Sequence, residues 1–383
     1  ITPTLSGIGE AVMKSAFGNG FGFKFDNGLS VNDIFKYNYG GFLLETPEEI
    51  ENAVFVGTVT DDGKFSYKDE SVDEKEILKI YEDKLESVFR CNIKNPEGKI
   101  ETFSYNCTSR PSPSIKVAKP KVLIPVFPGT NCELDSAKAM RDAGAEPEIF
   151  VINNRSPKKV AESVERFAKE IEKSQMIFIP GGFSGGDEPD GSGKFITAFF
   201  RNAVIKEQVT ALLEERDGLM CGICNGFQAL IKLGLVPYGK IIDTDENCPT
   251  LTYNTIARHQ SKIVRTRIAS NKSPWLAETE VGEIYNVPIS HGEGRFIASE
   301  ELIGKLAENG QIATQYVDEN ENATSDIHFN PNGSMFAIEG ITSPDGRVFG
   351  KMGHSERYAP DLYKNVPGNY DIKMFESAVK YFK

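Results

Sequence analysis

From residue 121 onward, short apolar runs alternate with stretches in which apolar residues recur at helical spacing. The runs that predict strands cover residues 122–127, 148–152, 175–180 and 218–223, and the stretches that predict helices cover residues 132–144, 158–173, 195–215 and 225–233. Strands that alternate with helices form a mostly parallel sheet with helices on both faces. The pattern therefore predicts an α/β fold, in which binding sites form at the carboxyl ends of the strands.

The same region carries further signals. Asn131 is predicted to cap the helix at 132–144, because acidic residues follow it in the first turn. Short alternating runs at residues 263–268 and 335–341 predict additional, partly antiparallel strands. The chain is predicted to close with a helix over residues 370–382.

The first hundred residues are less regular. They predict a helix over residues 7–16 and two strands, at 54–60 and 64–67, separated by a turn. Residues 18–22 are glycine-rich but follow the helix, whereas a phosphate-binding loop follows a strand and opens a helix. A simple turn is therefore favoured over a phosphate-binding loop.

A linker is predicted at residues 108–120, which hold three prolines and three serines and lack an amphipathic period. It divides the chain into a smaller α+β domain with the linker, residues 1–118, and a larger α/β domain, residues 119–383. The chain opens at Ile1 directly in a helical pattern, from which we expect a C-terminal piece of a longer protein.

Composition narrows the classes of function. The net charge of −12 argues against non-specific binding to nucleic acid, which needs a basic surface. No apolar run approaches the roughly 18–20 residues of a membrane helix, and no secretory signal opens the chain. The six cysteines are too scattered for a disulfide framework. We therefore expect a cytoplasmic protein with neither a nucleic-acid nor a membrane partner.

The strongest chemical signal is Gly222-Ile223-Cys224-Asn225-Gly226, which lies between a predicted strand and a predicted helix. A nucleophile at such a turn is held in a strained conformation, and glycines flank it where close packing leaves no room for side chains. We predict Cys224 as the nucleophile, with its pKa lowered by the helix N-terminus. The backbone N–H of Asn225 is predicted to stabilise the oxyanion.

Three other roles for Cys224 stay open from the residues alone. With Cys221 it forms a Cys-x-x-Cys pair, typical of redox proteins, although Cys221 falls inside a predicted strand. The same pair is half of a zinc site, which would need a second pair of ligands. Cys224 is also compatible with an inert buried thiol.

A cysteine nucleophile needs a base, and the chain has four histidines. His354 stands two residues before Glu356, and on an extended segment the two side chains would point the same way. Glu356 would then hold one ring nitrogen of His354 and leave the other for Cys224, which completes a Cys-His-Glu triad. Residues 180–187 form a glycine-rich segment after a predicted strand, where Gly182, and after it Phe183, are predicted as the second oxyanion donor.

These motifs together resemble the glutaminase domain of class I glutamine amidotransferases. Within that class they are similar to the glutaminase part of the phosphoribosylformylglycinamidine synthase family. The motifs that carry the resemblance lie at residues 127–135, 180–187, 224–228, 291–296 and 353–357. Residues 7–22, 38–42 and 56–59 resemble the last domain of the synthetase portion of the large, single-chain form of that enzyme. Residues 188–194 depart from the family pattern, which leaves the contacts of that loop open.

The resemblance implies a reaction. Cys224 attacks the side-chain amide of glutamine, releases ammonia and forms a thioester that water hydrolyses. The ammonia serves the ATP-dependent conversion of formylglycinamide ribonucleotide to formylglycinamidine ribonucleotide in purine biosynthesis. No cofactor is expected in this chain, whereas ATP and Mg are expected in the full-length synthetase. The implied partners are glutamine and the missing N-terminal synthetase portion.

The resemblance also suggests two residues that bind substrate. Gln228, one helical turn after Cys224, would help to bind the main-chain groups of glutamine, and His291 is either a pocket residue or a structural hydrogen bonder. Two other functions share part of the pattern. A cysteine hydrolase or peptidase would use the same nucleophile and histidine on other substrates, and an interaction module would use neither.

Overall fold

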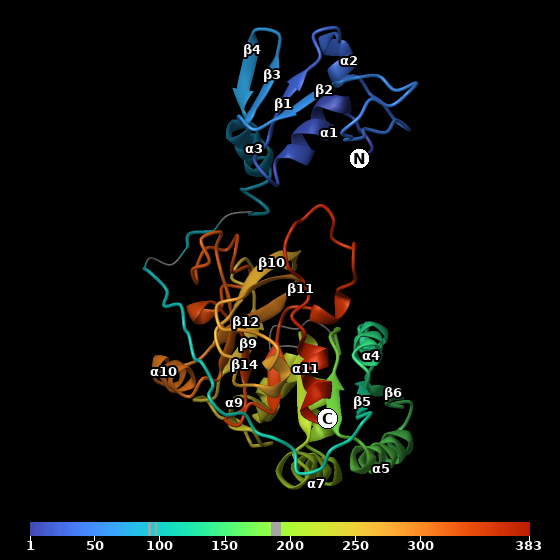
Figure 1. Cartoon of the computed structure of the whole chain (residues 1–383), viewed down its shortest axis with the longest axis vertical. Helices are drawn as coiled ribbons and strands as arrows, with labels where there is room; N and C mark the ends of the chain where they lie inside the picture. The colour runs from blue at the N-terminus through green and yellow to red at the C-terminus, as the bar shows by residue number, and fades with distance from the viewer. Residues whose placement is uncertain (91–92, 96–97, 185–192) are drawn as a thin grey trace. The chain divides into compact units, whose positions relative to one another are not determined.

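The computed structural model describes residues 1–90, 93–95, 98–184 and 193–383. The chain forms two compact units, Ile1–Ile93 and Lys94–Lys383, which we call unit 1 and unit 2 and describe separately (Figure 1). Among the described helices, none combines the length and the apolar character that crossing a bilayer requires.

Unit 1 is built on a sheet that, among the described residues, has four strands in the order β2-β1-β3-β4. These strands are β1 (Gly22–Phe25), β2 (Gly57–Thr60), β3 (Lys64–Tyr67) and β4 (Glu70–Asp73), and the helices are α1 (Gly7–Ala16), α2 (Val31–Phe35) and α3 (Glu74–Asp83). The predicted helix and both predicted strands are confirmed. The two strands do not pair with each other, however, because β1 lies between them. The glycine-rich residues 18–22 end α1 and lead into β1, as expected of a turn.

Unit 2 contains a mixed sheet that, within the described residues, has nine strands in the order β11-β10-β13-β14-β15-β8-β7-β5-β6. The parallel half consists of β6 (Glu146–Val151), β5 (Lys121–Val126), β7 (Met176–Ile179), β8 (Leu219–Ile223) and β15 (Val348–Lys351). The antiparallel half adds β14 (Ile338–Thr342), β13 (Ile312–Tyr316), β10 (Gln260–Ile268) and β11 (Ile284–His291). A separate ribbon pairs β9 (Thr250–Tyr253) with β12 (Glu293–Ile297). The α/β architecture predicted from the alternation is confirmed.

The helices of unit 2 follow the predicted alternation. They are α4 (Glu133–Asp142), α5 (Pro157–Lys173), α6 (Lys194–Phe200), α7 (Ala203–Thr210), α8 (Asn225–Leu233), α9 (Leu235–Tyr238), α10 (Glu300–Glu308) and α11 (Met374–Tyr381). Helix α8 packs on β8, β15 and β7, whereas α11 contacts α4. A large apolar core lies between the helices and the sheet.

Two predicted elements are present but differ in part from the prediction, and one predicted helix cap is wrong. The helix expected at 195–215 is divided into α6, α7 and a π-helical turn, Ala211–Glu215. The run at 335–341 begins as a short 3₁₀ turn before β14. The N-cap of α4 is Cys132 rather than Asn131, whose side-chain oxygen accepts a hydrogen bond from the Cys132 thiol at 3.0 Å.

The predicted linker packs against unit 2. Within it, the N–H groups of Ser114 and Val117 donate to the Asp217 carboxylate and the carbonyl oxygen of Phe382, at 3.0 and 2.7 Å. The boundary between the two compact units falls between Ile93 and Lys94, whereas the predicted domain boundary lies at 118/119. A segment rich in proline cannot form a regular element, but its remaining N–H groups still need acceptors, and the surface of unit 2 supplies them.

Candidate active site

Cys224 lies at the turn between β8 and α8, where it is the N-cap of the helix. Its backbone angles are φ 53° and ψ −105°, a conformation that a residue with a side chain rarely adopts. The flanking glycines allow this turn to pack closely. A Cβ atom on Gly222 would lie 2.5 Å from the carbonyl carbon of Gly226, and one on Gly226 would collide with the carbonyl oxygen of Ile179. The strained turn predicted from the sequence is present.

The strand beside the nucleophile leads to the predicted base. β15 runs parallel to β8, and the N–H of Cys224 donates to the carbonyl oxygen of Lys351 at 2.9 Å. Three residues later, the Nδ1 atom of His354 lies 2.7 Å from Oε1 of Glu356, and both side chains are buried. The two residues sit at a short 3₁₀ turn, Ser355–Arg357, and not on the extended segment that we expected. The parallel pair of strands places Cys224 and His354 at the same edge of the sheet.

The surroundings shift the pKa values of Glu356 and Cys224 in opposite directions. Burial opposes the charge of Glu356, but the charge and hydrogen bond of His354 outweigh it and lower the pKa of Glu356 below its usual value. Burial raises the pKa of the Cys224 thiol well above its usual value, and the neighbouring Cys132 and Glu356 add to the rise. The N–H of Asn225 acts in the opposite direction but is weaker. The lowered pKa predicted for Cys224 is therefore wrong, because burial outweighs the helix N-terminus.

The glycine-rich segment after β7 lies beside the residues that follow β5. An isolated bridge joins Gly182 to Thr130, and Gly182 has φ +146°. The hydrogen bonds of this bridge involve the neighbours of Gly182, since the N–H of Phe183 donates to the carbonyl oxygen of Gly129 at 2.8 Å. Phe183 is thus not available as an oxyanion donor in this conformation, contrary to the prediction. Of the segment at 180–187, residues 185–187 lie outside the described residues, as does most of the 188–194 loop.

Asn225 and Gln228 form a chain of buried hydrogen bonds on α8. The Asn225 side-chain oxygen accepts from the N–H and the hydroxyl of Ser184, at 3.2 and 2.6 Å. The Asn225 amide donates to Gln228 at 2.9 Å, and the Gln228 amide donates to the carbonyl oxygen of Glu293 at 2.6 Å. The Gln228 side chain therefore joins α8 to β12, and its hydrogen bonds hold these two elements together beside Cys224.

His291 ends β11 and is 1% exposed. Within the described part of the chain, neither of its ring nitrogens has a hydrogen-bond partner. Burial lowers the pKa of His291 to about 3, and the nearby His354 and His259 act in the same direction. A buried neutral imidazole with unused nitrogens is a costly feature, as expected for a ring that meets a ligand or a bound water.

Three further residues lie near the predicted triad. The carbonyl oxygen of Ser290 lies 3.9 Å from the Cys224 sulfur, and the Ser290 hydroxyl lies 3.0 Å from Nε2 of His259. On the other side, the Cys132 sulfur lies 3.9 Å from Nδ1 of His354. Cys132 belongs to a motif that carried the family resemblance, whereas nothing local in the sequence distinguishes His259 or Ser290. Their proximity to the site arises from the pairing of β10 with β11.

Two of the other roles considered for Cys224, the redox pair and the half zinc site, find little support. Cys221 and Cys224 are both free thiols, and Cys221 is buried inside β8. Among the described residues, the group with metal-ligand spacing is Cys132, His354 and Glu356, which contains neither member of the Cys-x-x-Cys pair. The Arg357 guanidinium donates to the Cys132 sulfur at 2.9 Å, so a cation there would meet a positive charge.

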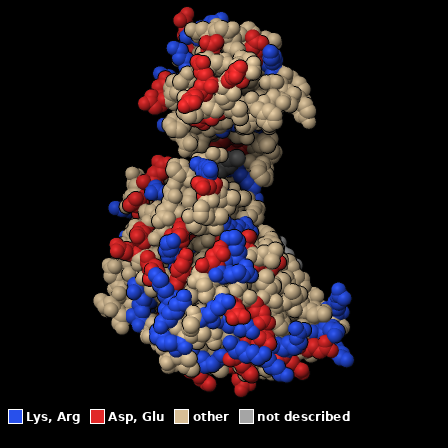
Figure 2. Space-filling model, turned by 45° about the vertical axis from the view of Figure 1, so that its right-hand side comes forward, with Lys and Arg blue, Asp and Glu red and all other residues tan. Residues whose placement is uncertain are grey.

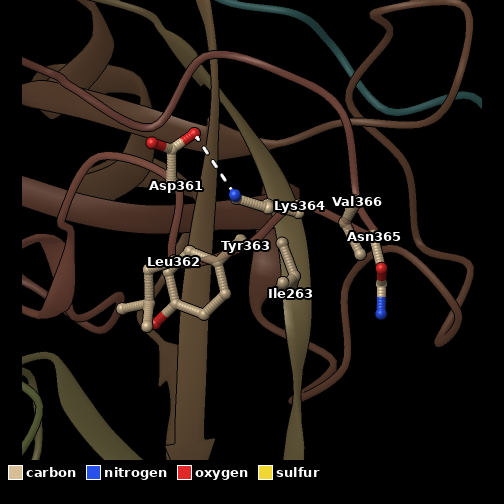
Figure 3. Close-up of a pocket in the computed structure, with 7 residues that line it drawn as sticks. All are labelled: Ile263, Asp361, Leu362, Tyr363, Lys364, Asn365 and Val366. Atoms are coloured by element: carbon tan, nitrogen blue, oxygen red, sulfur yellow. Dashed lines mark ion pairs between the residues drawn. The ribbon is translucent and has the colours of Figure 1, made fainter.

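The surface shows two other features. Basic and acidic side chains are interspersed over the face visible in Figure 2, without a dominant basic patch. Figure 3 shows a pocket of about 270 Å³ that lies between Ile263 of β10 and the segment from Asp361 to Val366. Its rim holds an ion pair between Asp361 and Lys364, and its lining includes none of the predicted site residues.

Comparisons with known proteins agree with this geometry. The model of the CobB/CobQ-like glutamine amidotransferase domain matches residues 119–382. The chain is 36% identical over 260 residues to phosphoribosylformylglycinamidine synthase subunit PurQ of Methanococcus maripaludis, which covers 68% of this chain and 88% of that relative. It also resembles the structure of PurLQS from Thermotoga maritima, with 27% identity and a TM-score of 0.50 over 69% of this chain and 100% of that one.

Proposed function

This chain belongs to the CobB/CobQ-like glutamine amidotransferase family and is a PurQ-like enzyme of purine biosynthesis. We propose that Cys224, His354 and Glu356 are the catalytic triad of its glutaminase. The observation that carries the proposal is the 2.7 Å contact between His354 and Glu356, at the turn that follows β15, the strand beside the strained Cys224 turn. That contact occupies Nδ1 of His354 and leaves Nε2 for the thiol.

The first half of the reaction releases ammonia. The buried thiol is neutral, because burial raises its pKa, so attack on glutamine requires a base. Nε2 of His354 takes the proton as the Cys224 sulfur bonds to the amide carbon of glutamine. The imidazolium, stabilised by the carboxylate of Glu356, then gives this proton to the departing nitrogen. The C–N bond breaks, ammonia leaves, and a glutamyl thioester remains on Cys224.

The second half regenerates the enzyme. His354 takes a proton from water, and the resulting hydroxide attacks the thioester carbon. The C–S bond breaks, the sulfur regains its proton from His354, and glutamate leaves. In both halves, negative charge develops on the carbonyl oxygen of the substrate. We assign its stabilisation to the backbone N–H groups of Asn225 and Gly182, since that of Phe183 is occupied.

The ammonia would serve a synthetase partner. The relative from Methanococcus maripaludis is named a subunit of phosphoribosylformylglycinamidine synthase, and a subunit implies a second component. We propose that the partner uses ATP and Mg to activate formylglycinamide ribonucleotide, and that residues 1–118 belong to the synthetase portion. The glycine-rich residues 18–22 do not fit a phosphate cradle, since they end α1 and lead into β1.

The test is covalent labelling with an electrophilic analogue of glutamine, followed by peptide mapping. The analogue should label Cys224, and Cys224→Ala should abolish both labelling and glutamine-dependent ammonia release. Cys248→Ala is the matched control, because Cys248 is a free thiol outside the site. Labelling of Cys132 or Cys221 in place of Cys224 would contradict the assignment. Turnover of peptides or esters without any response to glutamine would indicate a cysteine hydrolase.

A further inference from the structure

An ion pair that is fully shielded from solvent lies next to the His354 segment. Lys351 is the last residue of β15 and Glu339 belongs to β14, two strands that pair antiparallel. The Lys351 ammonium lies 3.3 Å from the Glu339 carboxylate, and both side chains have 0% exposure. Burying two charged groups away from water costs free energy unless hydrogen bonds satisfy their remaining polar atoms. The partners of those atoms therefore show what the pair holds in place.

The remaining bonds of the pair converge on the residues around His354. The Lys351 ammonium donates to the carbonyl oxygen of Gly353 at 2.9 Å and to the hydroxyl of Ser355 at 3.1 Å. The Glu339 carboxylate accepts from the N–H of Gly353 at 2.6 Å. The ion pair thus holds the N–H and the carbonyl oxygen of Gly353, which precedes His354. It also holds the hydroxyl of Ser355, which follows His354.

The pair is itself anchored to the sheet. The Thr314 hydroxyl, on β13, donates to the second oxygen of Glu339. His354 donates its own N–H to the carbonyl oxygen of Pro288 on β11 at 2.9 Å. The turn that carries the histidine is therefore tied to strands on its flank, although neither Lys351 nor Glu339 contacts the imidazole in the structure.

We propose that the Lys351–Glu339 ion pair is a positioning device that fixes the 353–355 backbone and thereby aims the His354 imidazole between Cys224 and Glu356. The proposal rests on the proposed role of His354 as the base of the triad. His354 and Glu356 are only two residues apart, on a turn whose backbone at His354 is not helical (φ −87°, ψ 74°). A turn of this kind keeps its geometry only where the surrounding structure defines it.

The experiment compares five variants of the full chain, with His354→Asn as the reference for loss of the proposed base. The double variant Lys351→Met with Glu339→Gln removes both charges together, so that no unpaired charge stays buried. Ser355→Ala removes one acceptor of Lys351, and Ser355→Thr restores a hydroxyl there. Ser377→Ala is the control, because Ser377 is a buried serine on α11 whose hydroxyl contacts Lys373 and Glu278 instead. Circular dichroism establishes that each variant is folded.

The readout separates positioning from binding. For each variant, the rate of Cys224 inactivation by the glutamine analogue is measured against analogue concentration and pH. We expect the double variant to lower the maximal rate about tenfold or more while the half-saturating concentration changes less than about twofold. Ser355→Ala should lower the rate by about threefold, Ser355→Thr should recover it, and Ser377→Ala should match the wild type. If the wild type does not react with the analogue, iodoacetamide replaces it as the probe of Cys224.

Each other outcome has a definite meaning. A folded double variant that reacts at the wild-type rate, with the wild-type pH profile, overturns the proposal. If the double variant does not fold, equal rates for Ser355→Ala and the wild type overturn it. His354→Asn distinguishes the two levels of the argument: a normal rate in His354→Asn refutes the triad itself. A loss in His354→Asn combined with a normal double variant refutes only the positioning role.

Discussion

The two units of the chain differ most in how much of their apolar surface they bury. Unit 2 has an extensive core between its helices and its sheet. The main cluster of unit 1 contains six buried residues: Val12, Ala16, Phe23, Phe25, Ile34 and Phe65. Most of the large exposed apolar side chains nevertheless belong to unit 1, among them Leu5, Tyr39, Phe42 and Val88, which are each at least 78% exposed.

This difference separates the roles of the units. A small unit buries a small fraction of its surface and is correspondingly marginal, while exposed apolar residues in number indicate an interaction surface. Unit 1 therefore exposes apolar surface of the kind that partner proteins cover, as the proposed synthetase portion would require. Unit 2 contains all the residues of the proposed triad within its own core. The following predictions test whether the units really behave differently.

The largest effect is expected from Phe65→Ala. Phe65 lies in the small core of unit 1, and removal of a buried phenyl ring costs about 3–5 kcal/mol. Because a whole domain is stable by only about 5–15 kcal/mol, unit 1 should unfold at much lower denaturant concentration. Limited proteolysis and denaturation should show this change while Cys224 still reacts with the glutamine analogue.

The matched variant is Phe167→Ala in unit 2, where the ring is likewise fully buried. It should move only the transition of unit 2, and it should leave the cleavage pattern of unit 1 unchanged. A single cooperative transition that both variants shift equally would mean that the units do not unfold independently, and the comparison would fail.

The sequence predicts unit 2 far better than unit 1 for a related reason. Most of the strands and helices between residues 121 and 233 bury an apolar run or face, so that their periodicity is visible locally. The short β1 is flanked by a glycine-rich turn and gives too few residues for a period. Its insertion between β2 and β3 is a long-range pairing that no local pattern encodes.

In the candidate site, too, local motifs predict some features and distant contacts determine the others. Cys224, His354 and Glu356 were found because each occupies a local motif with a chemical meaning. The raised pKa of Cys224 and the occupied N–H of Phe183 depend on segments distant in the chain, so no local pattern predicts them. His259 approaches the site only through the pairing of β10 with β11.

The second prediction uses pH to separate the units, since all four histidines lie in unit 2. The pKa of His291 is lowered to about 3 by burial, whereas in an unfolded chain it is about 6.5. The unfolded state therefore binds a proton below about pH 6.5 that the folded state does not, and stability falls as pH falls towards 3. At pH 5 the loss is about 2 kcal/mol, from about 1.4 kcal/mol per unit of pH.

Denaturation of the chain at pH 7 and pH 5 measures this loss. The transition of unit 2 should move, and His291→Phe, which cannot bind a proton, should reduce the shift. His328→Gln is the control, because His328 is exposed and should leave the shift unchanged. An equal fall in both units, or a fall that persists in His291→Phe, would refute the explanation.

The third prediction compares the same substitution at the start of one helix in each unit. The Ser30 hydroxyl accepts from the N–H of Asp33 in α2, and the Ser299 hydroxyl accepts from that of Leu302 in α10, both at 3.2 Å. Replacement of either serine by alanine should cost about 1 kcal/mol. Because the midpoint shift scales inversely with size, Ser30→Ala should lower the midpoint of unit 1 by about 4–8 °C and Ser299→Ala that of unit 2 by about 2–4 °C or less. Equal shifts in differential scanning calorimetry would contradict the difference in size of the cooperative units.

The smallest effect on stability is expected where the apolar surface of unit 1 is most exposed. Tyr37 and Tyr39 are 60% and 83% exposed, and their rings stack on each other 6.0 Å apart. Replacing both by serine should change the unfolding free energy by less than about 0.5 kcal/mol, because neither ring belongs to a core. The same change should reduce the binding of a hydrophobic dye and the concentration-dependent association seen in sedimentation, since it removes surface suited to a partner. Leu134→Ser, at an apolar side chain of unit 2 that is 70% exposed, is the matched control and should alter neither measurement. If Leu134→Ser reduces dye binding as much as the tyrosine pair does, the exposed residues of unit 1 are ordinary surface, and the contrast between the units lies only in the size of their cores.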